Sequence, residues 1–279
     1  MDEAIESKRV TVPVDGAATE LRYLTGGDGP PLLFLHGIGL DAAAVSWRYT
    51  LPALAEEYTV YALDLPGHGD SAKPRRTYTT DYYVDALSAF VDELEIGGAG
   101  VVGISMGGAV ALGHALDGGN PEKMVLVDSY GLGSDAYWRQ SASLALRVPF
   151  ADSMLWGTMG SRAAVRTSLK TMSGSRLPDD LVDDVHEAVT PATMRTLRSW
   201  QRHEFQADGL RTDFSDRLGE LDVPTLLIHG TDDPLLPVSW SERASKRLPN
   251  GQLHSVEGCG HWPPRERPEP FNRAVAAFF

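Results

Sequence analysis

Hydrophobic and polar positions follow two alternating patterns along most of this chain. Short, continuous apolar runs predict strands that are buried on both faces of a sheet. The clearest runs are residues 32–35, 58–63, 101–103, 124–127 and 224–228, preceded by β-rich segments at 9–12 and 20–24. Between the runs, apolar residues recur at helical spacing, most clearly over residues 80–94. Strands that alternate with helices predict an α/β fold with a parallel sheet covered by helices on both sides.

Residues 134–215 interrupt this alternation. No convincing strand pattern occurs there, and segments of helical character, such as 161–172 and 193–206, are separated by prolines. A chain of 279 residues is long enough for one α/β domain that carries an insertion. We therefore expect a core made of residues 1–133 and 216–279, with residues 134–215 forming an inserted helical cap.

A G-x-S-x-G motif occupies residues 103–107, directly after an apolar run and before a helical segment. In that context the motif predicts a sharp strand-to-helix turn that exposes the hydroxyl of Ser105 above the sheet, where it can act as a nucleophile. The helix that follows favours negative charge at its N-terminus. The structural alternative is a glycine-rich turn in which Ser105 only caps the helix.

A tetrahedral intermediate at such a serine needs two N–H groups that point at one oxygen. Met106, the residue after the nucleophile, supplies one backbone N–H in this arrangement. The glycine-containing loop at residues 36–39 follows an earlier strand, and Ile38 is our candidate for the second N–H. We expect His36 to hold this loop by hydrogen bonds, and we assign no catalytic role to Asp64 or His68.

A nucleophilic serine also needs a base with a near-neutral pKa, and His261 is the candidate among eight histidines. It lies in a glycine-flanked loop near the C-terminus. An acid should orient the imidazole, and the loop after the strand at 224–228 offers Asp233 as the leading candidate over Asp232. Asp128, at the end of another strand, is a further alternative. The order Ser105, Asp233, His261 is the order found in α/β-hydrolases.

Charge and cysteine content narrow the possible partners and the compartment. The chain has 38 acidic and 25 basic residues, for a formal charge of −13, so we expect no nucleic-acid partner. The single cysteine and the acidic start, without a signal-peptide pattern, favour a cytoplasmic protein. An uncharged stretch at 96–116 is long enough to span a membrane, but its glycines favour a buried strand, turn and helix instead, so no membrane insertion is expected. No metal-binding cluster or phosphate-binding loop is present in the sequence, and we expect no cofactor.

Taken together, these motifs resemble the α/β-hydrolase superfamily over nearly the whole chain. The resemblance implies an eight-stranded, mostly parallel sheet with a helical cap inserted after the sixth strand. Residues 258–272 are similar to meta-cleavage-product hydrolases, which cleave carbon–carbon bonds. That subfamily often has Asn before the nucleophile, where this chain has Ile104. Cofactor-free haloperoxidases, which share a serine-centred turn, are also similar.

The leading hypothesis is a serine hydrolase that cleaves a carboxylic ester, thioester or lactone of a small apolar substrate. The alternatives are a carbon–carbon bond hydrolase, a haloperoxidase or perhydrolase, and a ligand-binding receptor of the same fold. We expect Trp262 beside the base, and Phe150, Leu155 and Trp156 in the cap, to border the substrate pocket.

Overall fold

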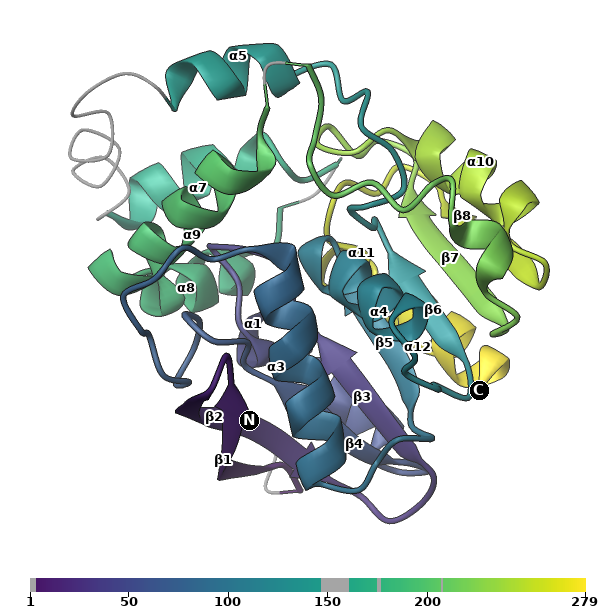
Figure 1. Cartoon of the computed structure of the whole chain (residues 1–279). Coiled ribbons are helices and arrows are strands. Elements are labelled where there is room, and N and C mark those ends of the chain that lie inside the picture. The colour runs from purple at the N-terminus through teal and green to yellow at the C-terminus, as the bar shows by residue number, and fades with distance from the viewer. Residues whose placement is uncertain (1–3, 147–160, 175–176, 207) are drawn as a thin grey trace.

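The computed structural model describes residues 4–146, 161–174, 177–206 and 208–279 (Figure 1). Eight strands form one sheet in the order β1-β2-β4-β3-β5-β6-β7-β8. Strand β2 runs antiparallel to both of its neighbours, and strands β3 to β8 are parallel to one another. The strands are β1 (Glu6–Val14), β2 (Ala17–Gly26), β3 (Pro31–Leu35), β4 (Thr59–Leu63), β5 (Gly100–Ile104), β6 (Met124–Val127), β7 (Thr225–Gly230) and β8 (Gly251–Val256). This is the mostly parallel, eight-stranded sheet that the resemblance to α/β-hydrolases implied.

Helices cover both faces of the sheet, as Figure 1 shows. One face is covered by α3, α4 and α10, and the other by α1, α2, α11 and α12. The core helices are α1 (Ala43–Ser46), α2 (Thr50–Leu54), α3 (Thr80–Glu93), α4 (Met106–Leu116), α10 (Val238–Arg247), α11 (Pro263–Glu266) and α12 (Pro268–Phe278). The helix predicted at residues 80–94 is therefore α3.

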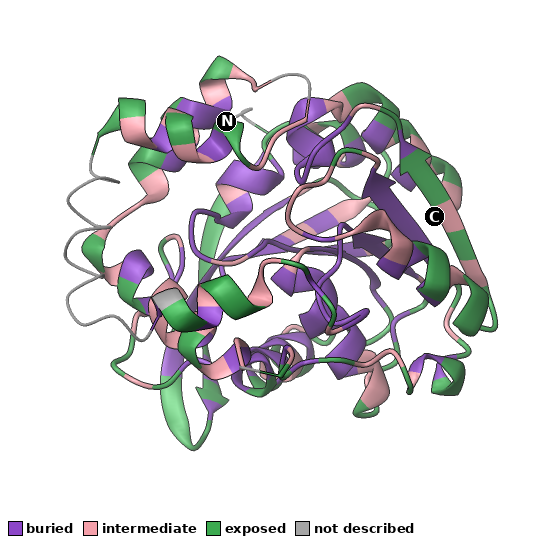
Figure 2. Ribbon diagram, turned by 90° about the horizontal axis from the view of Figure 1, so that it is seen from above, coloured by how far each residue is buried: buried purple, intermediate pink, exposed green. Residues whose placement is uncertain are grey.

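Each central strand contributes to two hydrophobic layers because successive side chains point to opposite faces. In β3, Leu33 and Leu35 pack with α3 and α4, whereas Leu32 and Phe34 pack with α1 and α12. All four side chains are buried. Burial on both faces explains why these strands appear in the sequence as continuous apolar runs, and Figure 2 shows the buried strands running through the middle of the molecule.

The segment between β6 and β7 is helical in its described part. It contains α5 (Arg139–Ala145), α7 (Arg162–Lys170), α8 (Asp179–Ala188), α9 (Pro191–Glu204) and the short 3₁₀ helix η1 (Leu218–Glu220). The sequence predicted the helices at α7 and α9. Val165, Leu181 and Met194 belong to the same buried cluster as core side chains, so these helices pack directly on the core. The boundaries of the cap at residues 134 and 215 remain a prediction.

The uncharged stretch at residues 96–116 contains β5, a tight turn and α4. Helix α4 is buried from Met106 to His114 because it packs against both β5 and α3. Within the described ranges, no helix has the length and apolar character needed to cross a membrane.

Candidate active site

The turn between β5 and α4 holds Ser105 in a strained conformation. Its φ of 53° and ψ of −120° lie in a region that residues with side chains rarely adopt. The flanking residues must be glycine, because a Cβ on Gly103 would collide with Gly107, and one on Gly107 would collide with the backbone of Leu35. The Ser105 side chain makes no capping hydrogen bond to α4. The alternative in which Ser105 only caps the helix therefore has no support, and the hydroxyl is available for chemistry.

His261 and Asp233 meet at the same edge of the sheet. The Nδ1 atom of His261 lies 2.7 Å from Oδ2 of Asp233. The other oxygen of Asp233 accepts the backbone N–H groups of Leu235 and Leu236 at 2.7 and 3.2 Å, which fixes the carboxylate. Ser105 and His261 line one cavity. The structure thus brings together the three residues that the sequence predicted as nucleophile, acid and base.

The protonation of His261 depends on its surroundings. Burial by itself lowers the pKa of the imidazole, but the negative charge and hydrogen bond of Asp233 raise it more. More distant carboxylates, Glu266 and Asp41, act in the same direction. The resulting pKa lies above the ordinary value of 6.5. The imidazole is therefore a stronger base than a free histidine.

The two alternative acids occupy different environments. Asp232 is exposed, and its carboxylate accepts the hydroxyl of the neighbouring Thr231. Asp128 is buried, and its Oδ1 accepts the backbone N–H of Gly230 at 2.9 Å. Burial and the negative charge of Asp233 raise the pKa of Asp128 well above its ordinary value, which favours a neutral carboxylic acid. Neither residue forms a hydrogen bond with His261 in the described structure, so the geometry favours Asp233 as the partner of the base.

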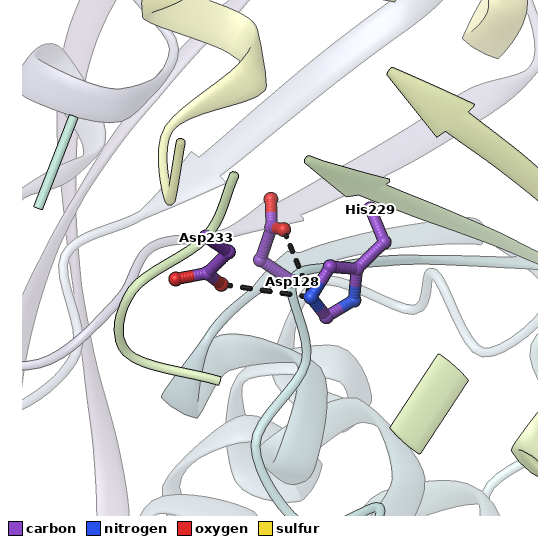
Figure 3. Close-up of side chains that lie close together, drawn as sticks. All are labelled: Asp128, His229 and Asp233. Carbon is purple, nitrogen blue, oxygen red and sulfur yellow. Dashed lines mark ion pairs between the residues drawn. The ribbon is translucent and has the colours of Figure 1, made fainter. Parts of the chain in front are cut away.

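Figure 3 shows His229 beside both Asp128 and Asp233, with Nε2 at 3.5 and 3.6 Å from their carboxylate oxygens. One ligand atom from each of the three residues lies within 4.8 Å of the others, a spacing compatible with a metal ion. However, the ring nitrogens of His229 already contact the Ser241 hydroxyl at 2.7 Å and the Leu236 carbonyl at 3.1 Å. Since Asp233 is also bonded to His261, the cluster fits a support for the acid better than a metal site.

In the loop after β3, the backbone N–H groups on either side of Ile38 already have acceptors. The Gly37 N–H donates to Asp41 at 2.7 Å, and the Gly39 N–H donates to Nε2 of His68 at 3.1 Å. The Ile38 N–H between them has no acceptor within the described chain, and Ile38 borders the same cavity as Ser105. The Met106 N–H is at the first position of α4, where no intrahelical acceptor exists. These two groups are the ones that the sequence predicted for an oxyanion hole.

Two histidines hold this loop in place rather than acting as bases. Nε2 of His36 accepts the Leu65 N–H at 3.0 Å, while its Nδ1 contacts the Gly37 carbonyl at 2.6 Å. His68 accepts the Gly39 N–H in the same way, and burial lowers its pKa well below the ordinary value. The lowered pKa favours the neutral form of His68. Both rings hold the loop by hydrogen bonds, as expected for His36, and neither is a candidate base.

A chain of hydrogen bonds connects the loop that carries His261 to the loop after β3. The indole N–H of Trp262 donates to Ser46 at 2.8 Å, and the Ser46 hydroxyl donates to Asp41 at 2.6 Å. The same Asp41 oxygen accepts the Gly37 N–H. Trp262 was expected to border the substrate pocket, but the structure places it elsewhere. Its buried side chain packs in the core and is not part of the cavity lining.

The cavity above Ser105 and His261 has a volume of about 410 Å³ and a largely apolar wall. Its aromatic side chains come from two segments that are distant in sequence: Tyr130 and Trp138 follow β6, whereas Trp200 and Phe205 lie on α9 and at its end. Beyond Ile38, Ser105 and His261, the described lining consists of Leu40, Tyr130, Trp138, Ala142, Met172, Leu197, Trp200, Gln201, Phe205, Leu235 and Leu236. The predicted pocket residues Phe150, Leu155 and Trp156 lie outside the described residues.

Comparison with known proteins identifies the family of this chain. The model of the "Alpha/beta hydrolase family" matches residues 32–274. The chain belongs to this family. As a family member it is an α/β-hydrolase enzyme with the fold described above. A 2-hydroxy-6-oxo-6-(2'-aminophenyl)hexa-2,4-dienoic acid hydrolase of Metapseudomonas resinovorans is 30% identical, in an alignment covering 100% of this chain and 93% of that protein.

Solved structures of family members are also similar. A meta-cleavage product hydrolase of Pseudomonas fluorescens is 30% identical and superposes with a TM-score of 0.81 over 97% of each chain. An esterase of Exiguobacterium antarcticum has a TM-score of 0.80 over 97% of this α/β-hydrolase and 99% of the esterase, at 19% identity, which supports the fold alone. The relatives of this hydrolase at 30% identity thus include a dienoic acid hydrolase and a meta-cleavage product hydrolase.

Proposed function

We propose that this α/β-hydrolase cleaves a carboxylic ester, thioester or lactone of a small apolar substrate through an acyl-enzyme on Ser105. The observation that carries the proposal is the 2.7 Å contact between His261 and Asp233 at the cavity that Ser105 also lines. A serine, a base and an orienting acid at one cavity are the groups that acyl transfer through a covalent intermediate uses. The apolar wall of the cavity supports an apolar acyl group.

In the proposed reaction, neutral His261 takes the proton of Ser105 as its oxygen attacks the acyl carbon. The N–H groups of Ile38 and Met106 bind the oxygen that becomes negative. The intermediate then collapses, and His261 gives its proton to the departing alcohol or thiol. A water molecule, deprotonated by His261, attacks the acyl-enzyme in the second half of the reaction and releases the acid. Asp233 keeps the imidazole in the required orientation and stabilises its positive charge.

The test uses 4-nitrophenyl butyrate and a fluorophosphonate probe, with Ser105→Ala and a control, Ser245→Ala, in helix α10 outside the cavity lining. We expect the control to retain the wild-type rate and Ser105→Ala to lose nearly all of it. Peptide mapping should place the probe on Ser105. An undiminished rate in Ser105→Ala, or a probe attached elsewhere, would reject the assignment of the nucleophile.

A second candidate is hydrolysis of a carbon–carbon bond in a vinylogous diketone. It is favoured by relatives over the full chain whose names describe dienoic acid and meta-cleavage product hydrolases. In that reaction a proton must reach a substrate carbon before the acyl carbon is attacked. A panel of dienol substrates, measured beside the nitrophenyl esters, separates the two candidates by their kcat/KM values.

A further inference from the structure

The aromatic wall of the cavity has its polar groups turned away from the substrate space. The Tyr130 hydroxyl donates to Glu204 at 3.2 Å, and the Trp200 indole N–H donates to Thr80 at 3.3 Å. The Trp138 indole N–H donates to the carbonyl of Leu235 at 2.5 Å. Each of these donors already has a protein acceptor, so the rings present mainly carbon to a ligand. The described lining also contains no lysine or arginine.

A buried carboxylate stands behind this wall. Glu204, the last residue of α9, is fully buried. Its Oε1 atom accepts the Thr80 hydroxyl at 3.1 Å and lies 3.3 Å from the His203 ring, while Oε2 accepts the Tyr130 hydroxyl and the Thr212 N–H at 3.2 and 3.0 Å. Among the described residues, no lysine or arginine forms an ion pair with it. Its negative charge is thus stabilised by hydrogen bonds but is not neutralised by a permanent cation.

Tyr130 links this charge to the cavity, because its ring lines the cavity and its hydroxyl touches Glu204. Burial, and after it the negative charge of Glu204, raises the pKa of Tyr130 well above its ordinary value. A carboxylate entering the cavity would lose its water, find no cation in the described wall, and be repelled by Glu204 across a single ring. An uncharged acyl chain meets none of these costs.

We propose that this cavity selects uncharged acyl groups, and that Glu204 is a specificity-determining residue that excludes acyl groups ending in a carboxylate. The proposal rests on the function proposed above for Ser105. Arg139, on the first turn of α5, does not supply a cation to the described wall, because it donates to the carbonyl of Ala136 and is not part of the lining.

The first experiment compares 4-nitrophenyl pentanoate with mono(4-nitrophenyl) glutarate, in which the terminal methyl group is replaced by a carboxylate. Spontaneous hydrolysis is measured with the Ser105→Ala protein and subtracted. We expect kcat/KM for the pentanoate to exceed that for the glutarate by about 100-fold or more. Rates within threefold of each other, or a preference for the glutarate, would overturn the proposal.

Two variants assign the effect to Glu204. Glu204→Gln keeps the shape and the acceptor for Tyr130 but removes the charge, and should lower the pentanoate-to-glutarate ratio about tenfold. Its control is Glu220→Gln, an exposed residue that pairs with Arg217 and is not in the lining. Gln201→Arg, which adds a cation to the wall, should lower the ratio even if Glu204→Gln does not fold. An unchanged ratio in folded Glu204→Gln would remove Glu204 from the explanation.

A binding measurement separates failure of this proposal from failure of the proposed function. Quenching of tryptophan fluorescence in the Ser105→Ala protein reports on Trp138 and Trp200, with the stable 4-nitroanilides of pentanoate and glutarate as ligands. We expect the uncharged anilide to bind at least tenfold more tightly. If wild type hydrolyses neither ester but this difference is present, the ester function fails and the selectivity stands. Equal binding contradicts the selectivity whatever the reaction.

Discussion

Asp41 offers the sharpest test of how the loop after β3, which carries the Ile38 N–H, is held in place. Its Oδ2 atom accepts both the Gly37 N–H at 2.7 Å and the Ser46 hydroxyl at 2.6 Å, while Oδ1 accepts the Ala42 N–H at 2.8 Å. The perturbation is Asp41→Asn, which keeps the shape of the side chain. An amide has only one oxygen, so its NH₂ group must face either the Gly37 or the Ala42 N–H.

The expected magnitude follows from these contacts. One buried backbone N–H loses its acceptor, which costs about 1–3 kcal/mol of folding stability. The loop also carries the Ile38 N–H, and loss of one oxyanion donor lowers kcat by about 10²–10³-fold. Because Asp41→Asn displaces this donor rather than removing it, we expect kcat to fall by about 10- to 100-fold. KM should change little, since the interaction is made with the transition state.

The assay is steady-state hydrolysis of 4-nitrophenyl butyrate at a temperature where circular dichroism shows both proteins folded. Ser46→Ala should have a smaller effect, because it leaves the bond between Asp41 and Gly37 intact. Asp216→Asn, at an almost fully exposed side chain, is the control for loss of one negative charge. Folded Asp41→Asn with kcat within twofold of wild type would refute the role given to Asp41.

Four further predictions follow from the same geometry. Since only neutral His261 accepts a proton, kcat/KM should fall in acid with a midpoint above 6.5, and a wild-type midpoint below 6.5 would contradict this. Asp233→Asn should move the midpoint down and reduce kcat by about 10⁴-fold. Asp128→Asn should retain most activity and should not lower the melting temperature at neutral pH. The pKa of Asp128 is higher in the folded than in the unfolded protein, so at a pH above the unfolded value this carboxyl group destabilises the fold. An activity loss like that of Asp233→Asn would instead make Asp128 the acid. Burial also raises the pKa of the Cys259 thiol, so a thiol reagent should react only after denaturation, and rapid inactivation of the native enzyme would disagree. Trp262→Phe removes the hydrogen bond to Ser46, so it should lower the melting temperature by a few degrees and leave KM unchanged. A large rise in KM would show instead that Trp262 contacts the substrate.

The sheet, and the meeting of Ser105, Asp233 and His261 at one edge of it, were predictable because both depend on local patterns. Apolar runs define strands, and the carboxyl ends of parallel strands meet at one edge, so the loops that carry Ser105 and Asp233 had to be close in space. The choice of acid was not settled locally, since Asp128, Asp232 and Asp233 all follow strands. Only the three-dimensional structure shows which carboxylate contacts His261.

The pocket was less predictable, because its wall depends on how the segment between β6 and β7 docks on the core. Tyr130 follows β6 and Trp200 lies on α9, yet their rings are in contact, with centroids 5.2 Å apart. Nothing in their spacing along the chain indicates this. Trp262 shows the opposite failure: it follows the base in sequence, but the chain turns into α11 at this residue and the indole points into the core.

The hydrogen bond between His68 and the loop after β3 has a consequence for the behaviour of the enzyme in acid. A ring nitrogen that accepts a backbone N–H cannot take up a proton without losing that bond, and the pKa of His68 is far below its value in an unfolded chain. Unfolding therefore takes up a proton at this residue, and stability declines as the pH falls below about 6.5. Acid would then loosen the loop that carries the Ile38 N–H as well as protonating His261, so a loss of activity in acid would combine two separate protonations.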